Sequence, residues 1–231
     1  TTPDPIEINK LMSEMIKMGI EYCVMEASSH AIDQIRISGS DLYVAIFSNI
    51  SHDHLDYHKT FLNYINTKKK LFDQLSENSF SVINTDDKRA DYIVQNSKSK
   101  VINYSVKSIS ENKARIIEKS VEGMLVEIDN QKVSLGVLGE FNLYNILSVY
   151  VFSKILKIDK IKSLKILSKL KPPKGRLEFI KSSNGSIGIV DYAHTPDALR
   201  NVLITLDDIK GDNKLISIIG AGGDRDKKKR P

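Results

Sequence analysis

Cysteine is almost absent from this chain, and long hydrophobic runs are absent altogether. The 231 residues contain a single cysteine, Cys23, which excludes an intramolecular disulfide and a cysteine-rich zinc site. One cysteine fits a reducing compartment, so we expect a cytoplasmic location. The longest apolar run, residues 42–47, is far shorter than the roughly 20 residues of a membrane-spanning helix. We therefore expect no membrane insertion.

The positive charge of the chain is small and concentrated at one end. The net charge is +5, and residues 224–231 hold five basic and two acidic side chains. The rest of the sequence is too evenly charged for a nucleic-acid-binding face, so nucleic acid is not expected as a partner. A non-catalytic module that binds nucleic acid through this basic end is kept as an alternative.

Hydrophobic residues make up 41% of the sequence, which excludes a wholly disordered or fibrous chain. The length predicts one large domain, or one domain and part of another. There is no initiator methionine and the sequence stops after Arg230 and Pro231, so we interpret it as a fragment of a longer protein.

Alternating strand and helix patterns predict an α/β fold with a mostly parallel central sheet flanked by helices. Asp4, Pro5 and Glu7 form a typical helix start. The expected strands are residues 22–27, 42–47 and 80–83, and a helix is expected over residues 61–75. Helical spacing indicates a buried stripe on the first helix, made of Ile8, Leu11, Met12, Met15 and Ile16.

The second half of the sequence predicts a small antiparallel insert and then a second α/β domain. Residues 101–138 form short alternating runs with a turn at Asp129 and Asn130. Helices are expected over residues 143–155 and 161–170, and residues 171–175 form the best linker. Beyond it we expect the start of a Rossmann-like domain, with a strand at 187–190, a helix at 196–206, a strand at 215–219 and a glycine-rich turn at 220–223. The expected domains are therefore residues 1–173 and 174–231.

Polar clusters follow the expected strands, where a parallel sheet forms its ligand crevice. Glu26 lies within the first strand, where an unpaired carboxylate is costly to bury, and carboxylates bind Mg²⁺. Residues 51–58 hold three of the five histidines, so a zinc hydrolase is an alternative. Against this alternative, Tyr57 separates Asp56 from His58, and the remaining histidines are few.

Three consecutive lysines, Lys68, Lys69 and Lys70, occur within the expected helix 61–75. At about 100° per residue, they cannot all share one helix face, so one must point toward the apolar side. Lys68 is such a candidate because it is four residues from both Tyr64 and Phe72. An unmodified lysine has three donors and no acceptor, so it cannot bind a cation.

Six motifs occur in one order along the chain: EASSH (26–30), NISHDHLDYH (49–58), GEFNLYN (139–145), GRLE (175–178), DYAHTPD (191–197) and GGDRDKKKRP (222–231). Taken together, they resemble the Mur ligase family over essentially the whole sequence. The resemblance implies an ATP-dependent ligase of peptidoglycan biosynthesis that uses Mg²⁺. It would join a diamino acid to UDP-N-acetylmuramoyl-L-alanyl-D-glutamate through an acyl phosphate, and it would act as a monomer.

The resemblance also implies roles for individual residues. Glu26 and His54 would bind magnesium, and Lys68 matches the carbamylated lysine of the family, whose carboxylate can bind metal. The residues expected around ATP are Asn142, Asn145, Arg176 and Asp191. Those expected to hold the UDP-muramoyl dipeptide are Thr1, Thr2, Ser28, Gln34 and Arg36. Arg225 would bind a carboxylate of the incoming amino acid, with Arg230 as a nearby alternative.

The family's P-loop, which ends in Gly-Lys-Thr or Gly-Lys-Ser, does not occur in this sequence. The resemblance implies that it lies upstream of Thr1, so we expect the fragment to be inactive alone. Residues 1–173 would then be the central ATP-binding domain, and residues 174–231 the beginning of the amino-acid-binding domain. A related folylpolyglutamate or cyanophycin synthetase is the alternative within the same superfamily.

Overall fold

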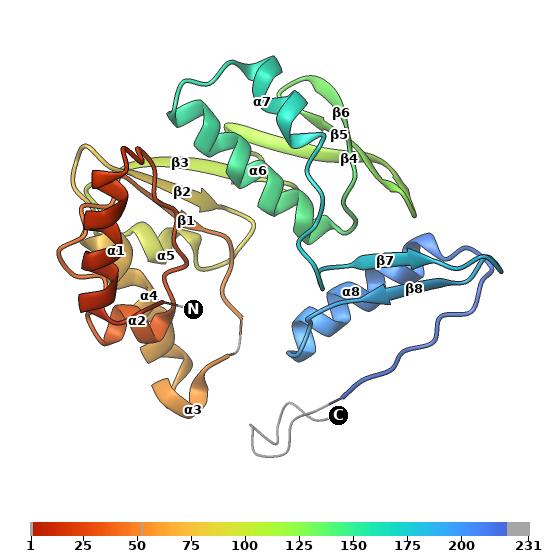
Figure 1. Ribbon diagram of the computed structural model, residues 1–231, viewed down its shortest axis with the longest axis horizontal. Helices are drawn as coiled ribbons and strands as arrows, with labels where there is room; N and C mark the ends of the chain where they lie inside the picture. The colour runs from red at the N-terminus through yellow and green to blue at the C-terminus, as the bar shows by residue number, and fades with distance from the viewer. Residues whose placement is uncertain (1, 52, 221–231) are drawn as a thin grey trace. The chain divides into compact units, whose positions relative to one another are not determined.

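The structure is a computed structural model that describes residues 2–51 and 53–220. The chain divides into two compact units (Figure 1). The first unit comprises Thr1–Ser81 and Lys88–Val101, and the second comprises Val82–Asp87 and Ile102–Pro231. These units are not the two domains expected from the sequence, and the boundary near residue 173 stays a prediction.

Among the described residues, the strands form one six-stranded sheet and one two-stranded sheet. The larger sheet has the order β1 (Val44–Phe47), β2 (Phe80–Asn84), β3 (Lys100–Ser105), β4 (Asn112–Ser120), β5 (Gly123–Ile128) and β6 (Gln131–Leu135). The smaller sheet pairs β7 (Glu178–Lys181) with β8 (Ile187–Val190) in antiparallel register. The mostly parallel sheet of an α/β fold is confirmed, and so is its antiparallel insert, β4–β5–β6.

Helix α4 is the centre of the helices of the first unit. These helices are α1 (Pro5–Lys17), α2 (Ser29–Asp33), α3 (Leu55–His58), α4 (Phe61–Asp73) and α5 (Ala90–Val94). Helix α4 packs against α2, α3 and α5, as Figure 1 shows. The buried residues Tyr64, Leu71 and Phe72 lie on its inner face at helical spacing, so the predicted helix 61–75 is confirmed.

Helix α1 begins where the sequence predicts, but its apolar stripe is not core. Asp4 caps the helix by accepting hydrogen bonds from the N–H groups of Ile6 at 2.9 Å and Glu7 at 3.1 Å. Ile8 is buried, whereas Ile16 is 76% exposed. The prediction of a buried stripe was wrong because no helix or strand among the described residues packs extensively on this side of α1.

Two of the predicted strands are not strands. Residues 20–28 and 214–220 form no strand. Val24 is 87% exposed and Ile218 is 97% exposed. Apolar β-branched residues favour an extended backbone, but a strand also needs a hydrogen-bonded neighbour. Within the described residues, neither segment pairs with a neighbouring strand.

The second unit is built around α6 (Glu140–Ile155), which packs against β4 and α7 (Lys160–Leu167). Leu143, Leu147 and Val151 of α6 are fully buried. The predicted turn is confirmed: Asp129 and Asn130 have φ of 51° and 60°, so both are left-handed, as in the two-residue turns that favour tight hairpins. The turn joins β5 to β6.

The linker region leads into a hairpin and a helix of the second unit. The predicted strand 187–190 is β8, and the predicted helix 196–206 is α8 (Pro196–Ile209), capped by Thr195. Strand β7 was not predicted. A buried cluster of Leu138, Leu177, Val202 and Leu206 packs α8 and the residues just before β7 against the chain just before α6. No helix among the described residues is long and apolar enough to cross a membrane.

Candidate active site

The predicted acceptor-binding residues of the first unit come together around Thr2. The Thr2 side chain is buried, and its hydroxyl donates to the Glu26 carbonyl oxygen at 2.8 Å. The Thr2 and Ser28 side-chain oxygens are 3.4 Å apart. Ser28 also caps α2 by accepting from the Ala31 N–H at 3.1 Å. The segment before α2 is therefore held against the N-terminal residues by hydroxyl groups.

Arg36 belongs to the same hydrogen-bond network because it also contacts Thr2. Its Nη1 donates to the Thr2 carbonyl oxygen at 2.9 Å, and its Nε donates to Gln34 Oε1 at 2.8 Å. Gln34 Nε2 in turn donates to the Tyr57 hydroxyl at 3.3 Å. A guanidinium oriented in this way presents fixed donors, which suits a carboxylate or phosphate group of a ligand.

Lys68 lies beside Glu26, as a shared metal site requires. The Lys68 ammonium donates to the Ala27 carbonyl oxygen at 3.1 Å, next to Glu26 in the chain. Burial lowers the pKa of Lys68, and the Glu26 carboxylate opposes this shift. Glu26 itself is exposed, so the sequence argument from the cost of burying its carboxylate was wrong. What favours Glu26 as a ligand is its position next to Lys68.

The sequence predicts that one of the three lysines of α4, with Lys68 as the candidate, points toward the apolar side, but two of them are withdrawn from solvent. Lys68 is half-buried and Lys70 is exposed. Lys69 is buried and pairs with Asp73 at 2.5 Å, so its charge is compensated within the helix.

His54 contacts α4 through an aromatic side chain. The rings of His54 and Tyr64 are 5.9 Å apart between centroids, and Tyr64 lies one turn before Lys68 on α4. His54 precedes α3 with φ of 55°, and its N–H donates to Asp53 Oδ1 at 2.9 Å. This left-handed residue allows the chain to turn sharply into α3 and directs His54 toward α4.

Sequence reasoning missed a cluster of rings beside these residues. His58 is buried, and its Nε2 is 2.9 Å from the Ser29 hydroxyl. The His30 ring lies 4.2 Å from that of Tyr57, which donates its hydroxyl to Asp33 at 2.9 Å. The histidine-rich segment 51–58 signalled this cluster, but only the fold shows that His58 contacts α2 rather than solvent.

The zinc alternative gains no support from the described residues. Within them, no three histidine, cysteine, aspartate or glutamate side chains are grouped to hold a metal ion. His52, the first histidine of the segment 51–58, lies outside the described residues. Among the predicted metal ligands, the Glu26 carboxylate is the type of oxygen donor that magnesium prefers.

The predicted nucleotide-binding asparagines lie together on the first turns of α6. Asn142 Nδ2 donates to the Leu138 carbonyl oxygen at 2.7 Å, and Asn145 Nδ2 donates to Asn142 Oδ1 at 3.4 Å. Gly139 precedes this helix with φ of 86°, and an added Cβ would lie 2.6 Å from the Phe141 ring. Only glycine fits there, which explains why the motif GEFNLYN starts with this residue.

Arg176 and Asp191 are joined by the backbone around Leu177. Asp191 Oδ2 accepts the Leu177 N–H at 2.8 Å, and Oδ1 accepts the Ala193 N–H at 2.7 Å. The Arg176 guanidinium lies 5.0 Å above the Tyr192 ring centroid. Leu177 packs against Leu138, so these residues and the asparagines of α6 flank one buried cluster.

We call Thr2, Glu26, Ser28, Gln34, Arg36, His54 and Lys68 the acceptor region. We call Asn142, Asn145, Arg176 and Asp191 the nucleotide region. The acceptor region belongs to the first unit and the nucleotide region to the second. Thr1, Arg225 and Arg230, also predicted to contact substrate, lie outside the described residues.

Models of two protein families match the chain. The Mur ligase middle domain matches residues 1–152, and the Mur ligase, glutamate ligase domain matches residues 175–231. The first match covers more than half of the sequence. The chain belongs to the Mur ligase family, as the six motifs predicted.

Similar proteins agree with this family. The chain is 46% identical over 231 residues to a UDP-N-acetylmuramoyl-L-alanyl-D-glutamate–2,6-diaminopimelate ligase of Cytophaga hutchinsonii. It is 47% identical over 232 residues to the protein of that name from Bacteroides fragilis. Both alignments cover 100% of this chain and 48% of the relative, so the chain spans about half the length of these curated relatives. A solved structure of such a ligase superposes with a TM-score of 0.79 at 32% identity, covering 100% of this chain and 48% of that one.

Proposed function

We propose that this chain is part of an ATP-dependent ligase of peptidoglycan biosynthesis. Its acceptor would be UDP-N-acetylmuramoyl-L-alanyl-D-glutamate, and the amino acid added would be 2,6-diaminopimelate, the two named in its relatives. The observation that carries the proposal is the half-buried Lys68 amine of the acceptor region, whose pKa is lowered by burial and which interacts with the Glu26 carboxylate. A buried amine of lowered pKa at that place is suited to carbamylation.

Carbamylation turns Lys68 from a cation into an anion. The neutral amine adds to carbon dioxide, a nitrogen–carbon bond forms, and one proton is released to give a carbamate. Burial favours the neutral amine because it disfavours the ammonium ion. The carbamate oxygens, with Glu26 and His54, would hold Mg²⁺, whose charge lowers the repulsion between the two anionic reactants. Imidazole is an unusual ligand for Mg²⁺, so His54 is the weakest member of this set.

The reaction forms an amide in two transfers. The D-glutamate side-chain carboxylate attacks the γ-phosphorus of ATP, and ADP leaves as an acyl phosphate forms. The amine of the amino acid then attacks the acyl carbon, and phosphate leaves. Arg36 and Thr2 would hold and orient the acceptor for the first step, because positioning dominates phosphoryl transfer.

The remaining residues would bind the other groups. Asn142, Asn145, Arg176 and Asp191 would surround the adenine, ribose and phosphates. Thr1, Ser28 and Gln34 would contact the UDP-muramoyl dipeptide, and Arg225 the carboxylate of the amino acid. We propose residues 1–173 as the central domain and residues 174–231 as the start of the next, which the two family matches support. A cytoplasmic location and a monomeric state remain predictions.

Phosphate release from ATP tests the proposal in the protein expressed from its complete coding sequence. With Mg²⁺ present, we expect release only when the UDP-muramoyl dipeptide and a diamino acid are both supplied. Comparing 2,6-diaminopimelate with L-lysine identifies the amino acid. Release that depends instead on a folate and glutamate, or on a cyanophycin primer, would replace the proposal with the superfamily alternative.

The zinc alternative has its own test. Elemental analysis of the purified protein would detect stoichiometric zinc, which the proposal does not expect. Zinc together with hydrolysis that needs no ATP would overturn the ligase proposal.

A further inference from the structure

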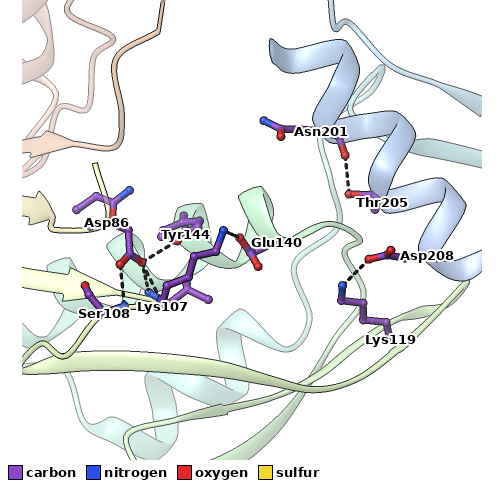
Figure 2. A network of polar contacts seen from close by, with 11 residues as sticks. Asp86, Lys107, Ser108, Lys119, Glu140, Tyr144, Asn201, Thr205 and Asp208 are labelled. Carbon is purple, nitrogen blue, oxygen red and sulfur yellow. Dashed lines mark hydrogen bonds and ion pairs between the residues drawn. The ribbon is translucent and has the colours of Figure 1, made fainter. Parts of the chain in front are cut away.

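The Asp86 carboxylate, just beyond β2, accepts hydrogen bonds on both of its oxygens (Figure 2). Oδ2 accepts the backbone N–H groups of Val106 and Lys107, each at 2.8 Å. Oδ1 accepts the Ser108 N–H at 2.8 Å, and the Tyr144 hydroxyl donates to Oδ2 at 2.7 Å. Burial alone would raise the pKa of Asp86, but these hydrogen bonds outweigh burial and hold the pKa well below its usual value.

Asp86 therefore joins three parts of the second unit. It follows β2, it fixes the loop between β3 and β4, and it holds Tyr144 on α6. Lys107 of the same loop also pairs with Glu140, in the first turn of α6, at 2.6 Å. Figure 2 shows both contacts between this loop and the helix. The start of α6 is thus anchored at two residues, Glu140 and Tyr144.

These two anchors lie beside the two asparagines of the nucleotide region. Asn142 lies between Glu140 and Tyr144 in the sequence, and Asn145 follows Tyr144. Successive helix residues are rotated by about 100°, so fixing the Tyr144 side chain also fixes the direction in which Asn145 points. Asn145 is exposed and its hydrogen bond to Asn142 is long, at 3.4 Å, so its own contacts hold it weakly.

We propose that Asp86 and Tyr144 are a positioning pair that orients Asn142 and Asn145 of α6 for the nucleotide. The pair touches no substrate itself. This inference rests on the proposed function, because it requires these asparagines to contact ATP. It extends that function by assigning a role to the polar cluster after β2, whose side chains carry no ligand contact in the site described above.

The chain offers a matched control on the same helix. Tyr150 is also on α6, and its hydroxyl donates to Asp129 Oδ2 at 2.7 Å, as the Tyr144 hydroxyl does to Asp86. Both bonds join a tyrosine hydroxyl to an aspartate of lowered pKa, and Tyr150 lies further along α6 from the asparagines. Tyr150 is the more buried tyrosine, and Asp129 also pairs with Lys160 at 3.6 Å. Tyr144→Phe and Tyr150→Phe each remove one hydroxyl and leave the ring in place.

The test compares both variants with the unchanged protein expressed from its complete coding sequence. We expect Tyr144→Phe to raise the KM for ATP, and the Kd for ADP measured by calorimetry, by about fivefold, with kcat changed less than twofold. Tyr150→Phe should change neither constant by more than about twofold, although both variants lower the melting temperature to a similar degree. Equal effects of the two variants on ADP binding would overturn the positioning role and leave a purely structural one.

Asp86→Asn provides a second variant. Its neutral amide accepts fewer of the four hydrogen bonds, so ADP binding should weaken at least as much as in Tyr144→Phe. In the double variant, the two effects should be less than additive, because both changes break the same contact. Full additivity would contradict the pair. If the unchanged protein binds no ADP and releases no phosphate, the proposed function fails. If the unchanged protein binds ADP and releases phosphate, but Tyr144→Phe and Tyr150→Phe bind ADP equally well, only this inference fails.

Discussion

The acceptor region and the nucleotide region are held together in different ways. In the acceptor region, side chains reach backbone atoms far away in the sequence: Thr2 reaches Glu26, Arg36 reaches Thr2, and Lys68 reaches Ala27. In the nucleotide region, the contacts are mostly between near neighbours, such as Asn142 with Leu138 and Asp191 with Ala193. Local contacts form with their helix or turn, whereas distant ones need the whole unit to fold first.

The two regions are therefore expected to respond differently to substitution, one by losing catalytic activity and the other by losing affinity. Burial lowers the pKa of Lys68 in the acceptor region, so under the proposed function one substitution there removes a reactive group. The nucleotide region contains polar side chains at the ends of regular elements, where under the same proposal one substitution weakens binding without removing chemistry. The expected effects of variants should therefore be largest where a reactive group is removed, smaller where a buried or binding contact is lost, and smallest on the surface.

The largest effect is expected at Lys68. In Lys68→Ala, activity should fall by about 10³-fold, because charge supplied by a bound metal ion is worth several kcal/mol. Short carboxylates added to the assay should restore part of it by replacing the carbamate. Lys70→Ala is the control: Lys70 is exposed, with an ion pair to Asp33 at 3.5 Å, and its loss should change turnover less than twofold. Unchanged turnover in Lys68→Ala would remove the metal role of this residue.

The next effect is on stability, at Asp86. Asp86→Asn should lower the free energy of unfolding at pH 7 by about 3 kcal/mol, as several hydrogen bonds to a charged group are weakened. The pKa of Asp86 is lower in the folded protein than in the unfolded chain. The stabilisation by its carboxylate is therefore complete above the unfolded-state pKa. It is lost as the pH falls from that value toward the folded-state pKa. Denaturant titrations at several pH values measure the free energy of unfolding of Asp86→Asn and of the unchanged protein. The difference between these two free energies should narrow below about pH 4.

Asp129→Asn is the control for that measurement. Asp129 accepts one tyrosine hydroxyl and pairs with Lys160 at 3.6 Å, so it has fewer hydrogen bonds to lose. Its effect at pH 7 should be about half as large or less. An equal loss at both aspartates would mean that the backbone donors around Asp86 contribute little.

A smaller effect, on binding alone, is expected at Arg36. Arg36→Ala should raise the KM for the UDP-muramoyl dipeptide about tenfold, because a donor pair for an anionic group is lost. The KM for ATP should change less than twofold, and Arg36→Lys should recover part of the affinity. Steady-state kinetics with each substrate varied in turn separates these effects. A larger change in the KM for ATP than in the KM for the dipeptide would contradict the assignment of Arg36 to acceptor binding.

The smallest effect is expected on the surface of the sheet. Arg115 donates to both carboxylate oxygens of Glu127 at 3.1 Å, but its side chain is 66% exposed. Arg115→Ala should lower the free energy of unfolding by at most about 0.5 kcal/mol and leave turnover unchanged. Thermal denaturation measures this value, and a loss above about 1 kcal/mol would show that exposure is a poor guide to importance in this sheet.

Much of the fold could be predicted from local signals. The Asp4 cap, the Asp129–Asn130 turn and the start of α8 at Pro196 each depend on a few adjacent residues, and each was correct. The expected strands at 22–27 and 215–219 were wrong for the opposite reason. Their sequences suit an extended chain, but pairing depends on residues elsewhere, which local pattern does not contain.

The candidate site shows the same limit. The motifs identified Lys68 and Glu26 as candidates, and the fold places them side by side. The roles of His58 and Tyr144 were missed, because a lone histidine or tyrosine carries no signal of its partner. Asp86 belongs to the polar cluster that follows the expected strand 80–83, but its four donors come from a loop and a helix about 20 and 58 residues away.

By itself, the sequence determined the family, the α/β class and the candidate reactive side chains, since these depend on residue type and order along the chain. Tertiary structure alone decided that Lys68 interacts with the Glu26 carboxylate, that Lys69 is buried against Asp73, and which aspartate anchors the start of α6. The physical reason is that a pKa and a hydrogen bond depend on the atoms within a few ångströms, and folding brings most of those atoms from distant parts of the chain.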